Sequence, residues 1–143
     1  DTIEPLLKDK RISYVRSAYT PYIYGKHMVY LTQFMEQSRS KLLFYLLNRK
    51  NFITSTDSRW FPSVVVVSYT TMKQMKYFLK KMPDNTSVII MFHHVYKKTD
   101  SAYGKGAWYW DADLFYELCE YIASDKNFKC INNIDLIKGD KND

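Results

Sequence analysis

An unbroken run of apolar residues, 88–92, ends at two adjacent histidines, His93 and His94. A run with no polar alternation is typical of a strand that is buried on both faces, as in parallel α/β sheets. In such sheets, ligands bind outside the carboxyl ends of the strands. The pattern therefore places two of the three histidines of the chain where a site is expected.

From residue 63 to residue 137 the pattern alternates clearly as β-α-β-α-β. The β-branched run 64–67 predicts a buried strand, and residues 128–131 predict the last strand. Between them, Thr70 or Thr71 can cap a helix, and Asp111 can cap a second one. The first helix has an apolar stripe of Met72, Met75, Phe78, Leu79 and Met82, with Lys73, Gln74, Lys76 and Lys80 outside. The second is expected to bury Leu114, Phe115, Leu118, Cys119, Tyr121 and Ile122. This alternation implies parallel strands joined by right-handed crossovers, with helices covering the sheet.

The first 62 residues are harder to interpret. Residues 2–10 resemble the end of a short helix, and 11–17 give a weak strand signal. Residues 28–35 fit a strand or a helix equally well. Residues 38–48 predict a helix with a Ser cap and with Leu42, Leu43, Leu46 and Leu47 on one side. The length of 143 residues, without repeats or a low-complexity linker, predicts a single α/β domain over residues 1–143.

Composition narrows the function classes. The formal net charge is +6, but the lysines are dispersed, which favours a solubilising surface over an attraction to anionic polymers. No nucleic-acid-binding signature is present, no run reaches transmembrane length, and no signal-peptide pattern opens at Asp1. Cys119 and Cys130 lie in apolar settings, so we expect buried free thiols. Thirteen Tyr, eight Phe and three Trp suit an aromatic-lined groove as well as a core.

Three interpretations of His93 and His94 compete. One histidine can pack in the core while the other faces solvent. Both can bind a metal with His27 and either Asp57 or Asp100, although adjacent strand residues point to opposite faces. The favoured interpretation is a general acid, because an imidazole at a strand end can protonate a leaving group. Nucleophile-elbow and phosphate-loop motifs are absent from the sequence, which argues against serine hydrolases and nucleotide enzymes.

These residues resemble a known family. The run IIMFHHV over 89–95, the aromatic WYW over 108–110, and the helix pattern from Asp113 to Ala123 are similar to the carboxyl-terminal part of polysaccharide deacetylases, the NodB-homology domain. Residues 11–22 (RISYVRSAYTPY) resemble the segment in which a strand ending in Arg precedes a Pro-Tyr groove loop. The resemblance covers roughly residues 10–137 and is strong from residue 63 onward. It implies a partial, parallel-stranded (β/α) barrel-like NodB-type fold.

The resemblance also implies roles for individual residues. His93 would be the general acid and Arg16 the supporting arginine of a catalytic base. The implied substrate-binding residues are Pro21, Tyr22, His94, Trp108 and Trp110. The implied reaction is hydrolysis of N-acetyl groups on amino-sugar polymers, and such a substrate favours a secreted or cell-surface location. His94 departs from the family, which often has Asp or another polar residue there.

A second departure concerns the metal. Family members use a zinc-like divalent ion held by one Asp and two His beside a base Asp, and no such set is found in this sequence. We therefore expect a carboxyl-terminal half of a longer deacetylase, then a degenerate glycan-binding domain, then a superficial likeness, in that order. A half domain would expose a sheet edge, which favours self-association.

Two alternatives from other classes stay open. The first is a non-catalytic glycan-binding module, in which rings from loops stack on sugars; its candidates are Tyr19, Tyr22, Tyr24, Trp108 and Trp110. The second is a basic α/β domain that binds an anionic partner, which predicts a steep dependence of binding on salt.

Overall fold

The computed structural model describes residues 15–17, 37–54 and 60–132, with the backbone alone described at 15–17 and 60. Three parallel strands form the main sheet in the order β1-β2-β3: β1 (Val15–Ser17), β2 (Trp60–Val66) and β3 (Ile89–Phe92). Beyond the end of β3, β4 (Val95–Tyr96) pairs in parallel with β5 (Trp110–Asp111). The prediction of an α/β protein with parallel strands is confirmed, while the described strands form no closed barrel.

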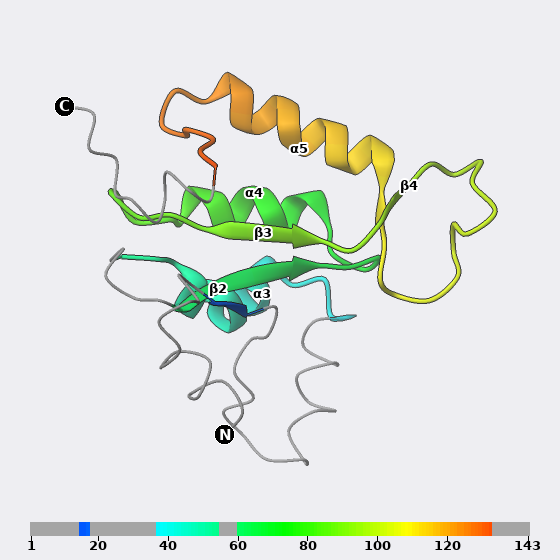
Figure 1. The fold of residues 1–143 in the computed structure, drawn as a ribbon, viewed down its shortest axis with the longest axis horizontal. Helices are drawn as coiled ribbons and strands as arrows, with labels where there is room; N and C mark the ends of the chain where they lie inside the picture. The colour runs from blue at the N-terminus through cyan, green and yellow to red at the C-terminus, as the bar shows by residue number, and fades with distance from the viewer. Residues whose placement is uncertain (1–14, 18–36, 55–59, 133–143) are drawn as a thin grey trace, which may run out of the picture.

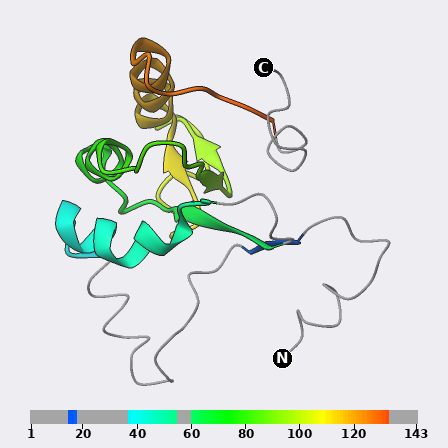
Figure 2. The same cartoon turned by 90° about the vertical axis from the view of Figure 1, so that its left-hand side faces the viewer.

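The described helices are α3 (Lys41–Asn48), the short 3₁₀ helix η1 (Arg49–Asn51), α4 (Met72–Lys80) and α5 (Ala112–Ser124). Figure 2 shows α3 and α4 on one face of the sheet, and Figure 1 shows α5 running alongside α4. α4 is the crossover between β2 and β3, so the predicted β-α-β unit is confirmed. No helix among the described residues is long and apolar enough to span a membrane.

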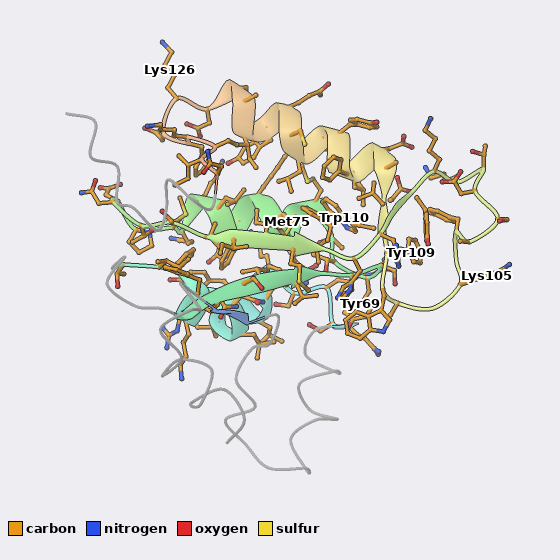
Figure 3. The ribbon with its side chains drawn as sticks, viewed as in Figure 1. Tyr69, Met75, Lys105, Tyr109, Trp110 and Lys126 are labelled. Atoms are coloured by element: carbon orange, nitrogen blue, oxygen red, sulfur yellow. The ribbon has the colours of Figure 1, made fainter. Side chains whose placement is uncertain are left out.

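The core lies between β2 and the helices. Val64 and Val66 of β2 face Met75 and Phe78 of α4, and Trp110 of β5 completes this cluster; all five side chains are fully buried. Figure 3 shows Met75 and Trp110 in this layer. The apolar stripe expected for residues 72–82 is confirmed at Met72, Met75, Phe78 and Leu79, which are buried, whereas Met82 is half-buried.

Caps set the beginnings of the helices as the sequence indicated. The hydroxyl of Thr71 accepts from the amide of Gln74 at 3.3 Å, while the Gln74 side chain accepts from the amide of Thr71 at 2.7 Å. This reciprocal pair is a capping box at the start of α4. Asp111 caps α5, and Ser40 rather than Ser38 caps α3.

Gln74 was expected on the outer side of α4, and that prediction is wrong. Its side chain is fully buried, because its oxygen closes the capping box and its nitrogen donates to the carbonyl of Ser40 at 3.5 Å. The residue therefore links the starts of α3 and α4.

The orientation predicted for α3 is also wrong. The buried positions of α3 are Phe44 and Asn48, whereas Leu42 and Leu46 are exposed. Apolar residues surround this helix on every side, so periodicity alone could not choose the face, and aromatic packing chose it. The Phe44 ring meets the Phe78 ring edge-on, with centroids 5.9 Å apart.

Three further expectations fail. Residues 88–92 are not buried on both faces: within β3 only Met91 is buried, and β2 is the only described neighbour of β3 in the sheet. Residues 128–131 form no strand. Cys119 and Cys130 are exposed free thiols, since Cys119 lies on the outer side of α5 and Cys130 follows in irregular chain. The elements expected over 2–10 and 28–35 lie outside the described residues.

Candidate functional site

The candidate site lies at the carboxyl ends of β2 and β3. β2 ends at Val66 and β3 at Phe92, and because the two strands are parallel these ends meet at one edge. His93 and His94 follow β3 directly. The long connection between β4 and β5 extends beyond the same edge, as Figure 1 shows. This arrangement brings residues from three separate stretches of the chain together.

Backbone hydrogen bonds hold the far end of that connection in place. The amide of Ser68 donates to the carbonyl of Ala107 at 3.0 Å, and the amide of Trp110 donates to the carbonyl of His94 at 2.9 Å. Residues 107–110 therefore lie against both the end of β2 and the two residues, His93 and His94, that separate β3 from β4. β3 and β4 belong to different sheets, because β3 pairs with β2 whereas β4 pairs with β5.

His93 and Trp108 form an exposed pair at this edge. The two rings meet edge-on, with centroids 4.7 Å apart and planes at 69°. The Trp108 side chain is 60% exposed, which is unusual for so large an apolar group. The pair presents an indole and an imidazole to solvent next to each other, so a molecule that stacked on the indole would lie beside the imidazole.

His94 belongs to a second group of rings. Its imidazole stacks on Tyr96 at 5.4 Å with planes at 5°. The ring centroids of Tyr96 and Tyr109 lie 5.8 Å apart, and those of Tyr109 and Tyr103 lie 5.2 Å apart. Tyr109 and Lys105 lie at the same end of the molecule in Figure 3. The two adjacent histidines therefore contact different rings: His93 packs against Trp108, and His94 stacks on Tyr96 of the tyrosine group.

Trp110 was expected to bind substrate, and the structure corrects this. Its side chain is fully buried, stacks on Phe92 at 5.5 Å, and donates from Nε1 to the carbonyl of Thr70 at 2.8 Å. Trp110 cannot reach a ligand at the surface. Instead it fastens β5 to the loop after β2, and so positions the neighbouring Trp108.

Asp111 anchors the connection between β4 and β5 from the other side. Its Oδ2 accepts from the hydroxyl of Tyr103 at 2.8 Å, and its Oδ1 accepts from the amide of Asp113 at 2.8 Å. Nζ of Lys98 lies 3.9 Å from Oδ2 of Asp111 and 3.4 Å from Oδ2 of Asp113. One carboxylate therefore caps α5 and holds the loop that carries the tyrosines.

The pKa values of this pair follow from the same contacts. Partial burial alone would raise the pKa of Asp111, but the hydrogen bonds from Tyr103 and the Asp113 amide, with the charge of Lys98, lower it. The hydrogen bond to Asp111 is the main cause that raises the pKa of Tyr103 to about 12, with burial and the carboxylates of Asp111 and Asp113 adding to it. The pair is therefore ionised at Asp111 and neutral at Tyr103 across the physiological range.

The described residues do not fit a metal site. Among them, no group of three or more His, Cys, Asp or Glu side chains lies close enough to hold an ion. The imidazoles of His93 and His94 contact different rings, and Asp100 accepts from the amide of Lys97 at 2.8 Å, which closes a turn. His27 and Asp57, the other candidate ligands, lie outside the described residues.

The structure does not bring Arg16 to His93. Arg16 of β1 pairs with Phe61 of β2, while Val66 pairs with Phe92, the residue before His93. The register therefore separates the two positions by six residue steps along the strands, or roughly 20 Å at ~3.3 Å per residue. Pro21 and Tyr22 lie outside the described residues.

The tyrosines of the loop were missed from the sequence. Tyr96, Tyr103 and Tyr109 follow no helical or strand period, so no pattern predicted that they would gather. The available signal was the proximity of Tyr103 and Tyr109 to Asp111, which had been predicted as a cap.

No protein-family profile, curated protein or solved structure matches the chain in sequence or in fold.

Proposed function

We propose that the chain carries the acid-bearing edge of a polysaccharide deacetylase site, with His93 as the general acid. The observation that carries this proposal is the exposed pair of His93 and Trp108 at the carboxyl end of β3. The family resemblance over residues 89–123 supplies the reaction, the hydrolysis of N-acetyl groups on an amino-sugar polymer. Trp110 has no direct role in this site, because it is fully buried. The support of a catalytic base by Arg16 stays a prediction.

The chemistry asked of His93 is the transfer of one proton. When water adds to the acetyl carbonyl and the C–N bond breaks, the departing sugar nitrogen must gain a proton. An imidazolium on the exposed edge supplies it, and Trp108 supplies an apolar face on which a sugar ring can stack. The family's divalent ion would polarise the carbonyl, but we assign it no ligand in this chain.

The test compares two adjacent histidines in the protein that carries this sequence. Release of acetate from an acetylated amino-sugar oligomer would be measured for His93→Ala and for His94→Ala. We expect His93→Ala to lower kcat by roughly 10²–10⁴-fold, the usual contribution of a general acid. His94→Ala is the matched control, because its ring stacks on Tyr96 away from Trp108, and it should change kcat only a few-fold.

The pH profile adds a second readout. A general acid must be protonated, so the wild-type rate should fall on the alkaline side, and His93→Ala should lose that limb. Equal activity of His93→Ala and wild type would overturn the assignment of His93. An equal loss in both variants would indicate a merely structural effect, and would overturn it too.

A second candidate is a non-catalytic glycan-binding module. The exposure of Trp108 favours it, because an exposed indole is suited to stacking on a sugar ring whether or not chemistry follows. Titration with N-acetylglucosamine oligomers should shift Trp fluorescence, and Trp108→Ala should abolish the shift. Buried Trp110 serves as an internal reference, because its emission should not respond. Absence of a shift with every oligomer would contradict this candidate.

A further inference from the structure

Aromatic rings from three separate elements meet at the end of β3. Phe92, the last residue of β3, stacks on Trp110 of β5, with centroids 5.5 Å apart and planes at 30°. The same Phe92 ring meets Phe115 of α5 edge-on, with centroids 5.1 Å apart and planes at 90°. Trp110 is fully buried, and Phe92 and Phe115 are partly buried against the core. We call Phe92, Trp110 and Phe115 the Phe92 clamp.

The clamp fixes the chain on both sides of His93. Phe92 immediately precedes His93, and its ring is packed by the other two members of the clamp. His94 immediately follows, and its carbonyl accepts from the amide of Trp110 at 2.9 Å. His93 therefore lies between two held residues, which leaves mainly its own side-chain torsions to decide where the imidazole points.

The backbone that carries Trp108 is fastened in the same way. The carbonyl of Ala107, the residue before Trp108, accepts from the amide of Ser68 at 3.0 Å. Two residues later, the side chain of Trp110 is fixed in the core. The 4.7 Å contact between the rings of Trp108 and His93 therefore depends on how these two backbone segments are placed. Trp110 belongs to one segment and contacts the other.

Phe115 contributes to the clamp from α5. The helix is itself anchored in the core, because Leu118 is buried. The described rings that Phe115 contacts are Phe92 and Tyr116, the latter at 6.0 Å. The direct route from Phe115 to His93 therefore runs through the ring of Phe92 and the peptide that joins Phe92 to His93. Through this route, the packing of α5 bears on the placement of the imidazole.

We propose that Phe115 is a positioning residue, which packs on Phe92 and thereby sets the imidazole of His93 against the indole of Trp108. Its consequence for the reaction rests on the proposed function, in which a general acid must lie close to the atom that it protonates. A misplacement of about 1 Å can lower a rate by roughly 10²-fold. Loss of the Phe115 ring should therefore lower kcat, while a sugar still stacks on Trp108 and KM changes little.

The experiment compares Phe115→Leu with Phe128→Leu in the full chain, by NMR of the histidine imidazoles. Phe128 is the matched control, because it is also partly buried against the core but contacts Tyr121 at 6.1 Å and lies beyond the other end of α5. Leucine keeps an apolar side chain at both positions and suits a helix. The His93 resonances are assigned by their loss in His93→Ala. Trp108→Ala gives their position without the ring current of the indole.

We expect Phe115→Leu to move the His93 resonances a substantial part of the way toward their position in Trp108→Ala. Phe128→Leu should leave them near wild type, although both leucine variants should lower the urea midpoint by similar amounts. Phe92→Leu should move the resonances at least as far. The double variant with Phe115→Leu should move them no further than Phe92→Leu alone, because the two rings act in one route.

The kinetic arm uses the protein that carries this sequence. Release of acetate from an acetylated amino-sugar oligomer should show kcat lowered on the order of 10-fold in Phe115→Leu, with KM changed little. Phe128→Leu should keep kcat close to wild type. The split between kcat and KM separates misplacement of the acid from a general loss of folded protein.

Three outcomes would overturn the inference. Unchanged His93 resonances in Phe115→Leu would show that this ring only stabilises the fold. Equal shifts in Phe115→Leu and Phe128→Leu would indicate a general loosening around α5. Additive shifts in Phe92→Leu and Phe115→Leu would show that Phe115 does not act through Phe92.

Failure of this inference can be told apart from failure of the proposed function, because the resonance shifts need no catalysis. Loss of kcat in His93→Ala with an unaltered kcat in Phe115→Leu would refute the positioning role and leave the proposed function intact. A wild-type kcat in His93→Ala would refute the proposed function. The resonance shifts alone would then decide whether Phe115 positions the imidazole.

Discussion

The neighbouring helices α3 and α4 use apolar residues in opposite ways. α4 buries its methionines and phenylalanine and turns lysines outward, so its amphipathic pattern and its packing agree. α3 buries Phe44 and Asn48 and leaves Leu42 and Leu46 exposed. Both helices pack on the same face of the sheet. The comparison shows that the packing partners of a helix, and not its hydrophobicity alone, determine which of its residues are buried. The exposure of Leu42 and Leu46 is therefore not explained by the core.

The contacts of α3 explain why it packs this way. Phe44 and Phe52 both contact the ring of Phe78 in α4, at 5.9 Å and 4.7 Å. Behind them, Nδ2 of Asn51 donates to Oδ1 of Asn48 and to the carbonyl of Ser63 in β2, each at 3.4 Å. Turning the leucines inward would break this aromatic cluster and the buried amide network together.

The largest expected effect tests the buried side of the comparison. Phe78→Ala removes a fully buried ring that both helices share, and should cost about 3–5 kcal/mol of unfolding free energy, the usual range for buried Phe→Ala. Leu42→Gln, on the exposed side, should change stability by less than about 0.5 kcal/mol. Urea unfolding of both variants measures the contrast, and equal losses would refute the assignment of the two faces.

A second, smaller effect tests the amide network behind α3. The Oδ1 atom of Asn51 is buried and has no hydrogen-bond partner, so a negative charge there would be unsatisfied. Asn51→Asp should cost about 3 kcal/mol at neutral pH, because a buried carboxylate lacks compensation. Burial raises the folded-state pKa of such a carboxyl above its ordinary value of about 3.9, so the loss should shrink as pH falls from neutral through the raised pKa and should level off below about pH 4.

Exposed Asn85 supplies the matched control for that experiment. Its backbone φ is 56°, a conformation that Asp adopts almost as readily as Asn, so Asn85→Asp changes the charge without burying it. Its stability should follow wild type from pH 4 to pH 7. A pH dependence of the same size in both variants would show that Asn51 is not a special position.

The smallest effect concerns α5, the third helix. Since the folded-state pKa of Asp111 is lowered, its contribution is complete above its ordinary value of about 3.9 and is lost as pH falls through the folded value. The pKa of Tyr103 is raised to about 12, so its contribution is complete below about pH 10 and is lost as pH rises through 12. Tyr103→Phe should therefore lower the urea midpoint slightly between pH 5 and pH 9.

The measurement for that variant is the urea midpoint across pH. The gap between wild type and Tyr103→Phe should narrow at pH 3 and again at pH 12. A gap that stayed constant from pH 3 to pH 12 would show that the hydroxyl of Tyr103 does not act through the carboxylate of Asp111.

Periodic elements could be predicted from the sequence, and non-periodic ones could not. The stripe of α4, the strand around Val64 and the Asp111 cap were all predicted, because each has a local signature. The orientation of α3 could not be predicted, because apolar residues surround it on all sides. The exposure of Cys119 depended on how α5 rotates against α4, which composition does not encode.

The candidate site shows the same division. His93 was found because it ends an apolar run, and Trp108 because it lies in an aromatic cluster. Trp110 was misassigned, since two residues in sequence separate the exposed indole from the buried one. The tyrosines that flank His94 meet only through the path of the loop, and a loop path has no period to read.

The strand register also bears on the order in which this chain folds. Trp110 pairs with Val95 and Ile89 with Ser63, whereas Val15 must find Trp60 across a much longer intervening chain. Each doubling of a closed loop costs about 0.6 kcal/mol in entropy, so the later pairs close more cheaply. Among the described strands, β1 leaves the ribosome before the others, yet its partner is the most distant in sequence. We therefore expect β1 to be the last of the described strands to join its sheet.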